Sequence, residues 1–184
     1  VAGSVPKAVG SAVSKRVSED TRSHDRFFLL GLGAHAGYAL VVAAVVLLAV
    51  GTFSLRFETF ALAGVVHLSA RPVLFLVERT YDGVGETGAA ATLDFVDGVL
   101  TAGLRFLFVF GFGWGVEALL WRAALSAVAV AGGAYLRRFG PPTQRPTRAD
   151  VRSFSEFAGP SFLARIGGTT YDNAATVLAG LLVS

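Results

Sequence analysis

Cysteine and methionine are absent from the 184-residue sequence, histidine occurs only three times, and charged residues make up only 16% of the chain. Without cysteine the protein has no disulfide bond, no thiolate nucleophile and no cysteine-ligated metal. The histidines lie far apart, and there is no metal-ligand spacing or nucleophile elbow, so we expect no metal centre, no cofactor and no enzymatic activity. A soluble domain usually has about 25% charged residues, and this chain therefore does not have the composition of one.

The chain contains several long apolar segments. Hydrophobic residues account for 53% of the chain, and within residues 27–136 they gather in runs of about 20 residues, the length that crosses a bilayer as a helix. The sequence therefore predicts an all-α fold, a polytopic membrane helix bundle with four full transmembrane helices. Their expected ranges are Phe27–Gly51, Glu58–Val77, Ala91–Phe112 and Val116–Leu136.

Polar segments flank this bundle. Residues 1–26 are basic, and apolar side chains recur there every three or four residues, which indicates a basic amphipathic helix at the membrane surface or the end of an upstream span. Residues 137–152 are rich in arginine and proline and are expected to form an extended linker. Residues 153–184 are expected to form a helix broken at Gly159-Pro160 and Gly167-Gly168. Because the chain lacks methionine and ends in an apolar run, we expect it to be part of a larger polytopic protein.

The charge distribution predicts the topology. Cytoplasmic segments of membrane proteins carry an excess of lysine and arginine, so residues 1–26 and 137–152 are both expected in the cytoplasm. An even number of spans must then separate them, and the hydropathy pattern gives four. The sequence thus predicts a multi-pass protein of the cell membrane.

The third span, Ala91–Phe112, carries a polar stripe. Asp94, Asp97, Thr101 and Arg105 are three, four and four residues apart, which places them on one face of a helix. Ionisable groups at membrane depth cost several kcal/mol unless they are paired or hydrated. The stripe is explained by an internal Asp–Arg pair that fixes helix packing, by the lining of a cavity, or by a mistaken helix assignment.

The second span contains His67 and Arg71, one helical turn apart on one face. They either join the polar cavity or form a helix-interface histidine and an arginine that extends to the membrane surface. The other ionisable residues that we single out as candidates are Glu117, Arg122, Arg165 and Asp172.

The segment Glu78–Gly88 is expected to be a flexible polar loop that leads into a helix. It contains Gly83-x-Gly85-x-x-Gly88, the spacing of a dinucleotide-binding turn. That fingerprint requires a short preceding strand and a soluble α/β unit, whereas here the preceding run is long enough to cross a bilayer. Nucleotide binding is therefore disfavoured.

Two stretches resemble a known family. SAVSKRVSED (11–20) is similar to the basic cytoplasmic segment after the second helix of the Wzx-type polysaccharide and oligosaccharide flippases of the MATE-like transporter superfamily, particularly archaeal members. RPTRADVRSFSEFAGPSFLARIGG (145–168) is similar to their linker and the start of the seventh helix. The resemblance implies that residues 27–136 form part of a first lobe and that residues 153–184 open a second.

By this resemblance, the chain belongs to a transporter that moves lipid-linked oligosaccharide across the membrane for cell-surface polysaccharide biosynthesis. The expected partners are membrane lipids and the lipid-linked substrate, with H⁺ or Na⁺ as the coupling ion and no nucleic acid. The candidate substrate-phosphate contacts are Arg71, Arg105, Arg122 and Arg165. The candidate ion-coupling or pairing residues are His67, Asp94, Asp97, Glu117 and Asp172.

Two other functions remain open at the level of sequence. One is a cation-coupled exporter of small molecules, of the multidrug type, in the same superfamily. The other is a membrane scaffold without transport activity, whose buried charges only pair helices. Cavity arginines disfavour the exporter, because lipophilic cations require acidic and aromatic surroundings.

Overall fold

The computed structural model describes residues 4–53, 58–115 and 117–183, apart from the side chains of 52–53, 58–60, 117, 166 and 169–183. The described residues form helices and connecting turns without a strand, which confirms the all-α fold. Three helices are long and apolar enough to cross a membrane, at Thr21–Gly51, Ala61–Gly83 and Ala118–Phe139. They correspond to the first, second and fourth predicted spans.

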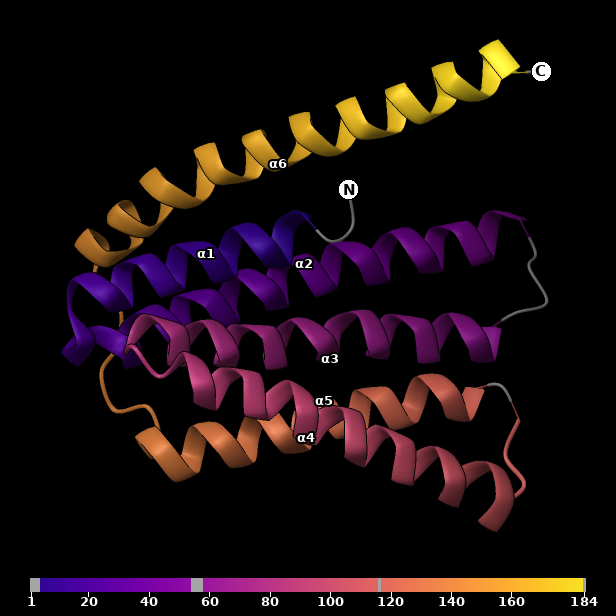
Figure 1. The fold of residues 1–184 in the computed structure, drawn as a ribbon, viewed down its shortest axis with the longest axis horizontal. Coiled ribbons are helices and arrows are strands. Elements are labelled where there is room, and N and C mark those ends of the chain that lie inside the picture. Colours follow the sequence, from indigo (N-terminus) through magenta and orange to yellow (C-terminus); the bar gives the residue numbers. More distant parts are fainter. Residues whose placement is uncertain (1–3, 54–57, 116, 184) are drawn as a thin grey trace.

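Most helices lie roughly parallel or antiparallel to the long axis of the molecule (Figure 1). In chain order they are α1 (Ser4–Glu19), α2 (His24–Phe53), α3 (Glu58–Gly83), α4 (Thr87–Phe106), α5 (Glu117–Phe139) and α6 (Arg148–Val183). A 3-10 turn, η1 (Thr21–Ser23), joins α1 to α2, and a π-helical turn, η2 (Leu107–Gly111), extends α4.

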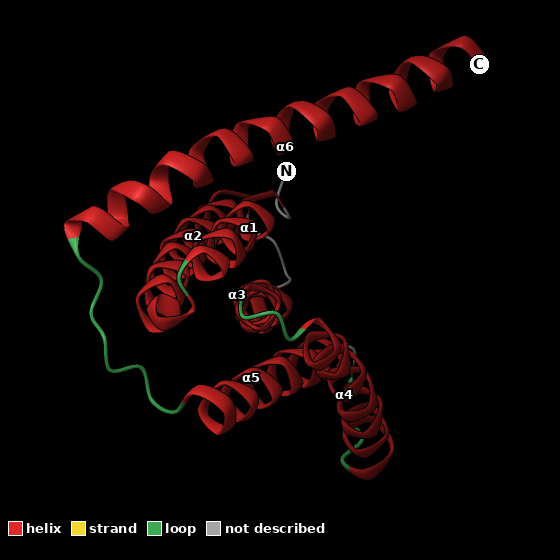
Figure 2. Ribbon diagram, turned by 60° about the vertical axis from the view of Figure 1, so that its left-hand side comes forward, coloured by secondary structure: helices red, strands yellow, loops and turns green. Residues whose placement is uncertain are grey.

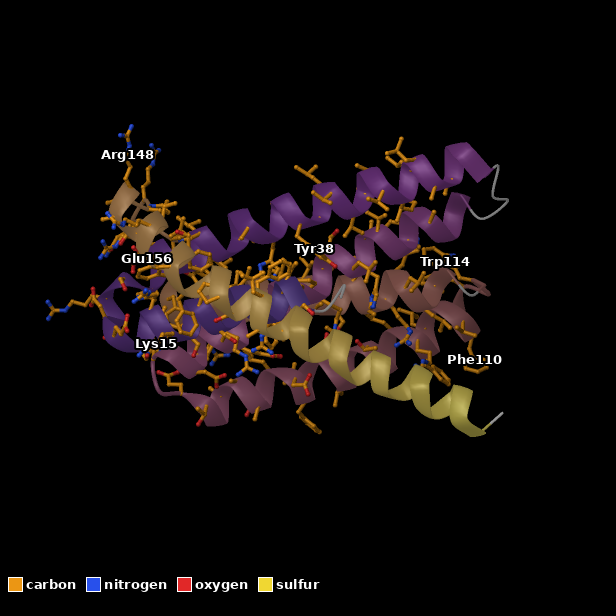
Figure 3. The ribbon with its side chains drawn as sticks, turned by 90° about the horizontal axis from the view of Figure 1, so that it is seen from above. Lys15, Tyr38, Phe110, Trp114, Arg148 and Glu156 are labelled. Carbon is orange, nitrogen blue, oxygen red and sulfur yellow. The ribbon has the colours of Figure 1, made fainter. Side chains whose placement is uncertain are left out.

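The two ends of the bundle differ in chemistry. The turns α1–α2, α3–α4 and α5–α6 meet at one end, which we call the basic end because Arg22, Arg138 and Arg148 lie there. The opposite end, the aromatic end, carries Phe110 and Trp114 (Figure 3). Residues 20–26, at the end of the first segment predicted to lie in the cytoplasm, thus meet residues 137–152 at the basic end of the bundle, whereas α1 extends from there toward the middle.

Hydrogen bonds fix the helix directions. Arg138 donates to Glu86, Ser126 to Asp97, and Arg122 to the carbonyl of Thr101, so α4 and α5 are antiparallel. The Tyr81 hydroxyl donates to the carbonyl of Ala134, which brings the basic ends of α3 and α5 together. α3 and α5 are therefore parallel and pack against each other, and α4, which connects them in the chain, runs in the opposite direction.

Helix α3 is the centre of the bundle. It packs against α1, α2, α4 and α5, as the end-on view shows (Figure 2). Its side chains Leu74, Leu76 and Val77 are almost completely buried. A helix enclosed on several sides needs apolar residues around most of its circumference, and this part of α3 has them.

Helix α1 is amphipathic, as its spacing predicts. Val9, Ala12, Val13 and Val17 are buried. However, α1 packs against α2, α3 and α6 and runs alongside α2 in the opposite direction (Figure 1). The placement of this helix on the membrane surface is therefore wrong, because its apolar stripe is covered by three neighbouring helices.

Three predicted boundaries also change. Helix α3 continues to Gly83, so only Val84–Glu86 remains of the loop predicted at Glu78–Gly88, and the turn uses the positive φ of Gly85. Helix α4 begins at Thr87 and passes into η2 instead of continuing as an α-helix to Phe112. Helix α5 reaches Phe139, which shortens the linker to 140–147.

The predicted breaks in the last helix are absent. α6 is continuous from Arg148 to Val183 and contains Pro160 within it. Proline removes one backbone donor but keeps a helical φ, and a glycine pair weakens a helix without ending it. Along its C-terminal half α6 projects away from the other helices (Figures 1 and 2).

The start of α6 is a capping box. The Thr147 hydroxyl accepts from the amide of Asp150 at 3.2 Å, and the Asp150 carboxylate accepts from the amide of Thr147 at 2.8 Å. Arg26 of α2 pairs with the same carboxylate at 3.4 Å. Partial burial alone would raise the pKa of Asp150, but the hydrogen bonds of Thr147 and the charge of Arg26 outweigh it and hold the pKa below its ordinary value.

Replacing Thr147 with alanine is expected to destabilise the first turn of α6 by about 1 kcal/mol, because an amide loses its cap. Hydrogen exchange of the α6 amides measures this loss. A carboxyl group with a lowered pKa stabilises the folded state above its unfolded pKa of about 4, and this contribution disappears as the pH falls through the lower folded value. The first turn of α6 in the wild type should therefore open below about pH 4. An exchange rate in Thr147→Ala equal to that of the wild type would contradict the capping role of Thr147.

Candidate functional site

A cavity of about 610 Å³ lies between α1, α2, α3 and α4. Its walls come mainly from α3, with the first turn of α1, the middle of α2 and the beginning of α4. The side chains that carry its chemistry are Lys7, Tyr38, His67, Arg71, Phe75, Glu78, Arg79, Asp82 and Asp94.

The cavity occupies the half of the bundle toward the basic end. Asp82 lies close to the end of α3, and His67 lies 15 residues earlier on the same helix, which corresponds to about 22 Å along the axis. Tyr38 of α2 is near the middle of the bundle (Figure 3). The cavity therefore extends from the basic end to about the middle of the bundle.

Two of its three cations are paired. Arg79 donates to Asp82 at 2.7 Å, and its guanidinium lies 4.6 Å from the centre of the Phe75 ring. Arg71 donates to Asp97 of α4. Among the residues that the structure describes, Lys7, Glu78 and Asp94 have no ion-pair partner, so one cation and two carboxylates in this cavity are open to a ligand.

Asp97 joins three helices. It is only 3% exposed, and its carboxylate accepts from Arg71 of α3 and from the Ser126 hydroxyl of α5 at 2.6 Å. The same hydroxyl is 3.1 Å from the carbonyl oxygen of Asp97. This is the internal Asp–Arg pair expected from the polar stripe, but its arginine comes from α3 and not from Arg105.

The structure places only part of the predicted site in the cavity. His67, Arg71 and Asp94 line it, and Asp97 lies behind Arg71. The other three arginines singled out from the sequence, Arg105, Arg122 and Arg165, do not line this cavity.

These three arginines have different surroundings. Arg105 is exposed on α4, and Arg122 is buried and bonded to the carbonyl of Thr101. Arg165 is exposed on α6 and donates to the Ser11 hydroxyl at 2.9 Å. Arg122 and Arg165 lie on α5 and α6, which do not contribute to the cavity walls, and Arg105 is not among the α4 residues that line it. The side chains of Glu117 and Asp172 fall outside those that the structure describes.

The site predicted from the sequence lacks four charged cavity residues, Lys7, Glu78, Arg79 and Asp82, as well as Tyr38 and Phe75. Three of the charged residues fall in the segment that the sequence predicts as a loop. Continuing the α3 pattern would have found two, because Glu78 and Asp82 follow Arg71 at seven and eleven residues, on the same helix face. Lys7 carried no comparable signal, since its role depends on the packing of α1 against α3.

No protein-family model matches the chain, and no curated protein or solved structure is significantly similar to it. Among the described residues, no group of three or more histidine, aspartate or glutamate side chains is arranged to hold a metal ion. The functional argument therefore depends on the cavity itself, on its charges and on its position in an apolar helix bundle.

Proposed function

We propose that the chain is part of a multi-pass membrane transporter that moves a lipid-linked oligosaccharide, with the basic end of the bundle in the cytoplasm. The observation that carries this proposal is the mixed-charge cavity between α1, α2, α3 and α4, in a bundle with three membrane-length helices. The two stretches that resemble Wzx-type flippases support the same function.

The directions of the helices support a fourth span. α3 and α5 are parallel, and both have the length and composition of membrane helices. If both cross the bilayer in the same direction, α4 has to cross it in the other direction between them. α4 carries Asp94, Asp97 and Arg105, and its buried carboxylate is paired, which lowers the cost of placing it at membrane depth.

The size and chemistry of the cavity suit a head group that carries phosphate and sugar. A volume of about 610 Å³ falls in the range of small-molecule sites, about 300–1,000 Å³. Lys7 supplies an unpaired positive charge for phosphate, the paired Arg71 and Arg79 add further N–H donors, and the carboxylates and Tyr38 line the cavity as hydrogen-bonding groups for hydroxyls. Glu78 and Asp94 are the carboxylates that we assign to coupling with H⁺ or Na⁺.

Replacing Lys7 with glutamine tests the substrate assignment. Lys7 has no ion-pair partner among the described residues, so its charge is available to a substrate phosphate. Losing one charge-assisted hydrogen bond weakens binding by about 1.5–3 kcal/mol, which corresponds to a decrease of roughly tenfold or more in glycan export at low substrate concentration. Export is measured as surface polysaccharide per amount of transporter in the membrane.

Lys15→Gln is the matched control, because Lys15 lies on the same helix, outside the cavity, and pairs with Glu19 on the exposed side of α1. Its export should stay at the wild-type level. Equal export by Lys7→Gln and wild type, at equal abundance, would refute a substrate role for Lys7.

A second function is favoured by one specific feature of the cavity. Two of its cations are already neutralised, and its walls also contain the carboxylates of Glu78 and Asp94 and the aromatic rings of Phe75 and Tyr38. This combination suits a lipophilic cation. An export assay with such cations separates the two functions: Glu78→Gln would abolish cation efflux in a multidrug-type exporter, whereas a flippase would show no cation efflux in either form.

A further inference from the structure

We propose that a phosphate group binds between α4 and α5, on the aromatic side of the Arg71–Asp97–Ser126 network, where it is held by Arg122, Arg105 and Thr101. This site is separate from the cavity, since none of these three residues lines it. The proposal concerns binding only and is independent of the transported substrate.

The main observation is a buried arginine without an anion. Arg122 of α5 is only 7% exposed. One terminal nitrogen donates to the carbonyl of Thr101 at 3.1 Å, and Nε is buried without any hydrogen-bond partner. Among the described residues no carboxylate pairs with this guanidinium, so a full positive charge inside the helix bundle is uncompensated.

The groups around Arg122 are also donors. The Thr101 hydroxyl is buried without a partner, and so is Nδ1 of His67 on α3. Arg105 lies close enough to Arg122 to repel it electrostatically, and His67 is within electrostatic reach of the same guanidinium. Two guanidinium groups and a hydroxyl supply hydrogens, and an anionic oxygen accepts from all of them.

The nearest described carboxylate on α4 does not neutralise this site. Asp97 lies one turn from Thr101, and its oxygens are already occupied by Arg71 and Ser126. A buried unpaired charge costs several kcal/mol, and water can satisfy its hydrogen bonds but cannot neutralise it. A bound anion satisfies both requirements.

The phosphate has two possible sources, and the position of Arg105 leaves both accessible. Arg105 is exposed on the surface of the bundle, in the last turn of α4. A lipid head group could present its phosphate to Arg105 from the membrane side, and inorganic phosphate could enter from the aqueous phase at the aromatic end. The shared chemistry is a tetrahedral anion with several acceptor oxygens.

Thermal unfolding of the purified chain in dodecyl maltoside micelles tests the site. One arm titrates inorganic phosphate at constant ionic strength, with a bulky organic anion as the balance, and the other adds phosphatidylglycerol to the micelles. We expect one of the two probes to raise the unfolding temperature saturably, because a ligand that binds only the folded state stabilises it. A response to inorganic phosphate identifies the free anion, and a response to phosphatidylglycerol alone identifies the lipid head group.

Arg122→Gln is expected to raise the half-saturating concentration of that probe by about tenfold or more, because one charged hydrogen-bond donor is lost. Arg105→Gln and Thr101→Val provide the same test with less buried side chains and should each weaken the response. Arg145→Gln, in the exposed linker, is the matched control and should respond like the wild type. The proposal is overturned if neither probe shifts the wild-type unfolding temperature, or if the three site variants and Arg145→Gln respond equally.

Discussion

Replacing Asp97 with alanine is expected to lower the free energy of unfolding by about 2–3 kcal/mol, because it removes the acceptor that joins α3, α4 and α5. The side chain of Asp97 is 4% exposed, and that of Arg71 is 44% exposed. Loss of one partner of a fully buried ion pair typically costs 3–5 kcal/mol. The smaller value expected here reflects the access of Arg71 to solvent in the cavity.

Unfolding of the purified protein by denaturant in mixed micelles measures this effect. Asp94→Ala is the control on the same helix, since Asp94 is exposed to the cavity and has no ion-pair partner among the described residues. Its stability should remain within about 0.5 kcal/mol of the wild type. A loss in Asp97→Ala no larger than that in Asp94→Ala would show that the three-helix network does not stabilise the bundle.

The double variant Arg71→Gln with Asp97→Asn separates packing from function. Both changes keep the shape and some hydrogen bonding while they remove the two charges together. If the pair only holds helices, the double variant should be more stable than Asp97→Ala and should keep its transport activity. If transport is lost at normal abundance, Arg71 has a role in the cavity in addition to its pairing with Asp97.

Replacing Asp25 with alanine is the second change with a large expected effect, a loss of about 2–3 kcal/mol. Asp25 is 5% exposed. Its carboxylate accepts from the Tyr135 hydroxyl at 2.9 Å and from the amide of Thr143 at 2.9 Å. The change leaves two donors without acceptors, and it disconnects α2 from α5 and from the linker that leads to α6.

The same unfolding experiment applies to this variant, with hydrogen exchange at Thr143 as a local measurement. Glu156→Ala is the control, because the ion pair of Glu156 with Arg152 is exposed and such pairs contribute about 0–1 kcal/mol. Faster exchange at Thr143 in Asp25→Ala alone is the expected result. Equal stability of the two variants would contradict the structural role of Asp25.

The sequence predicted the fold class well because bilayer-length apolar runs leave few alternatives to helices. It also predicted the amphipathic character of α1, from the three- and four-residue spacing of Val9, Val13 and Val17. It did not predict where α1 lies, because that position depends on which faces of α2, α3 and α6 are available to pack against the apolar stripe of α1.

Polar residues inside helices caused the errors in the boundaries. The charge of Glu78, Arg79 and Asp82 predicts a loop, yet in α3 all three line the cavity and Arg79 donates to Asp82. Pro160 was read as a helix break, although α6 continues through it. In both places the low helix propensity of the local residues is outweighed by the helical turns before and after them. Only the three-dimensional structure shows that the helix continues.

The site was predicted only in part, for a related reason. Spacing along α4 predicts one polar stripe with Asp94 and Asp97, and in the structure Asp94 lines the cavity while Asp97 lies behind Arg71. Spacing along α3 predicts one face for His67 and Arg71, and both line the cavity. Spacing within one helix does not reveal partners on another helix. The pairing of Asp97 with Arg71, and the contribution of Lys7 from α1, therefore required the packed bundle.

Chemical labelling of single cysteines tests the central claim, that α4 crosses the membrane between α3 and α5, most directly. The natural chain has no cysteine, so Gly88→Cys, Phe112→Cys and Arg145→Cys each provide one reactive thiol at an exposed position. A membrane-impermeant maleimide added to intact cells should label only Phe112→Cys, and the other two should react only after the cells are opened. Labelling of Gly88→Cys and Phe112→Cys from the same side would contradict the four-span arrangement and, with it, the proposed transporter.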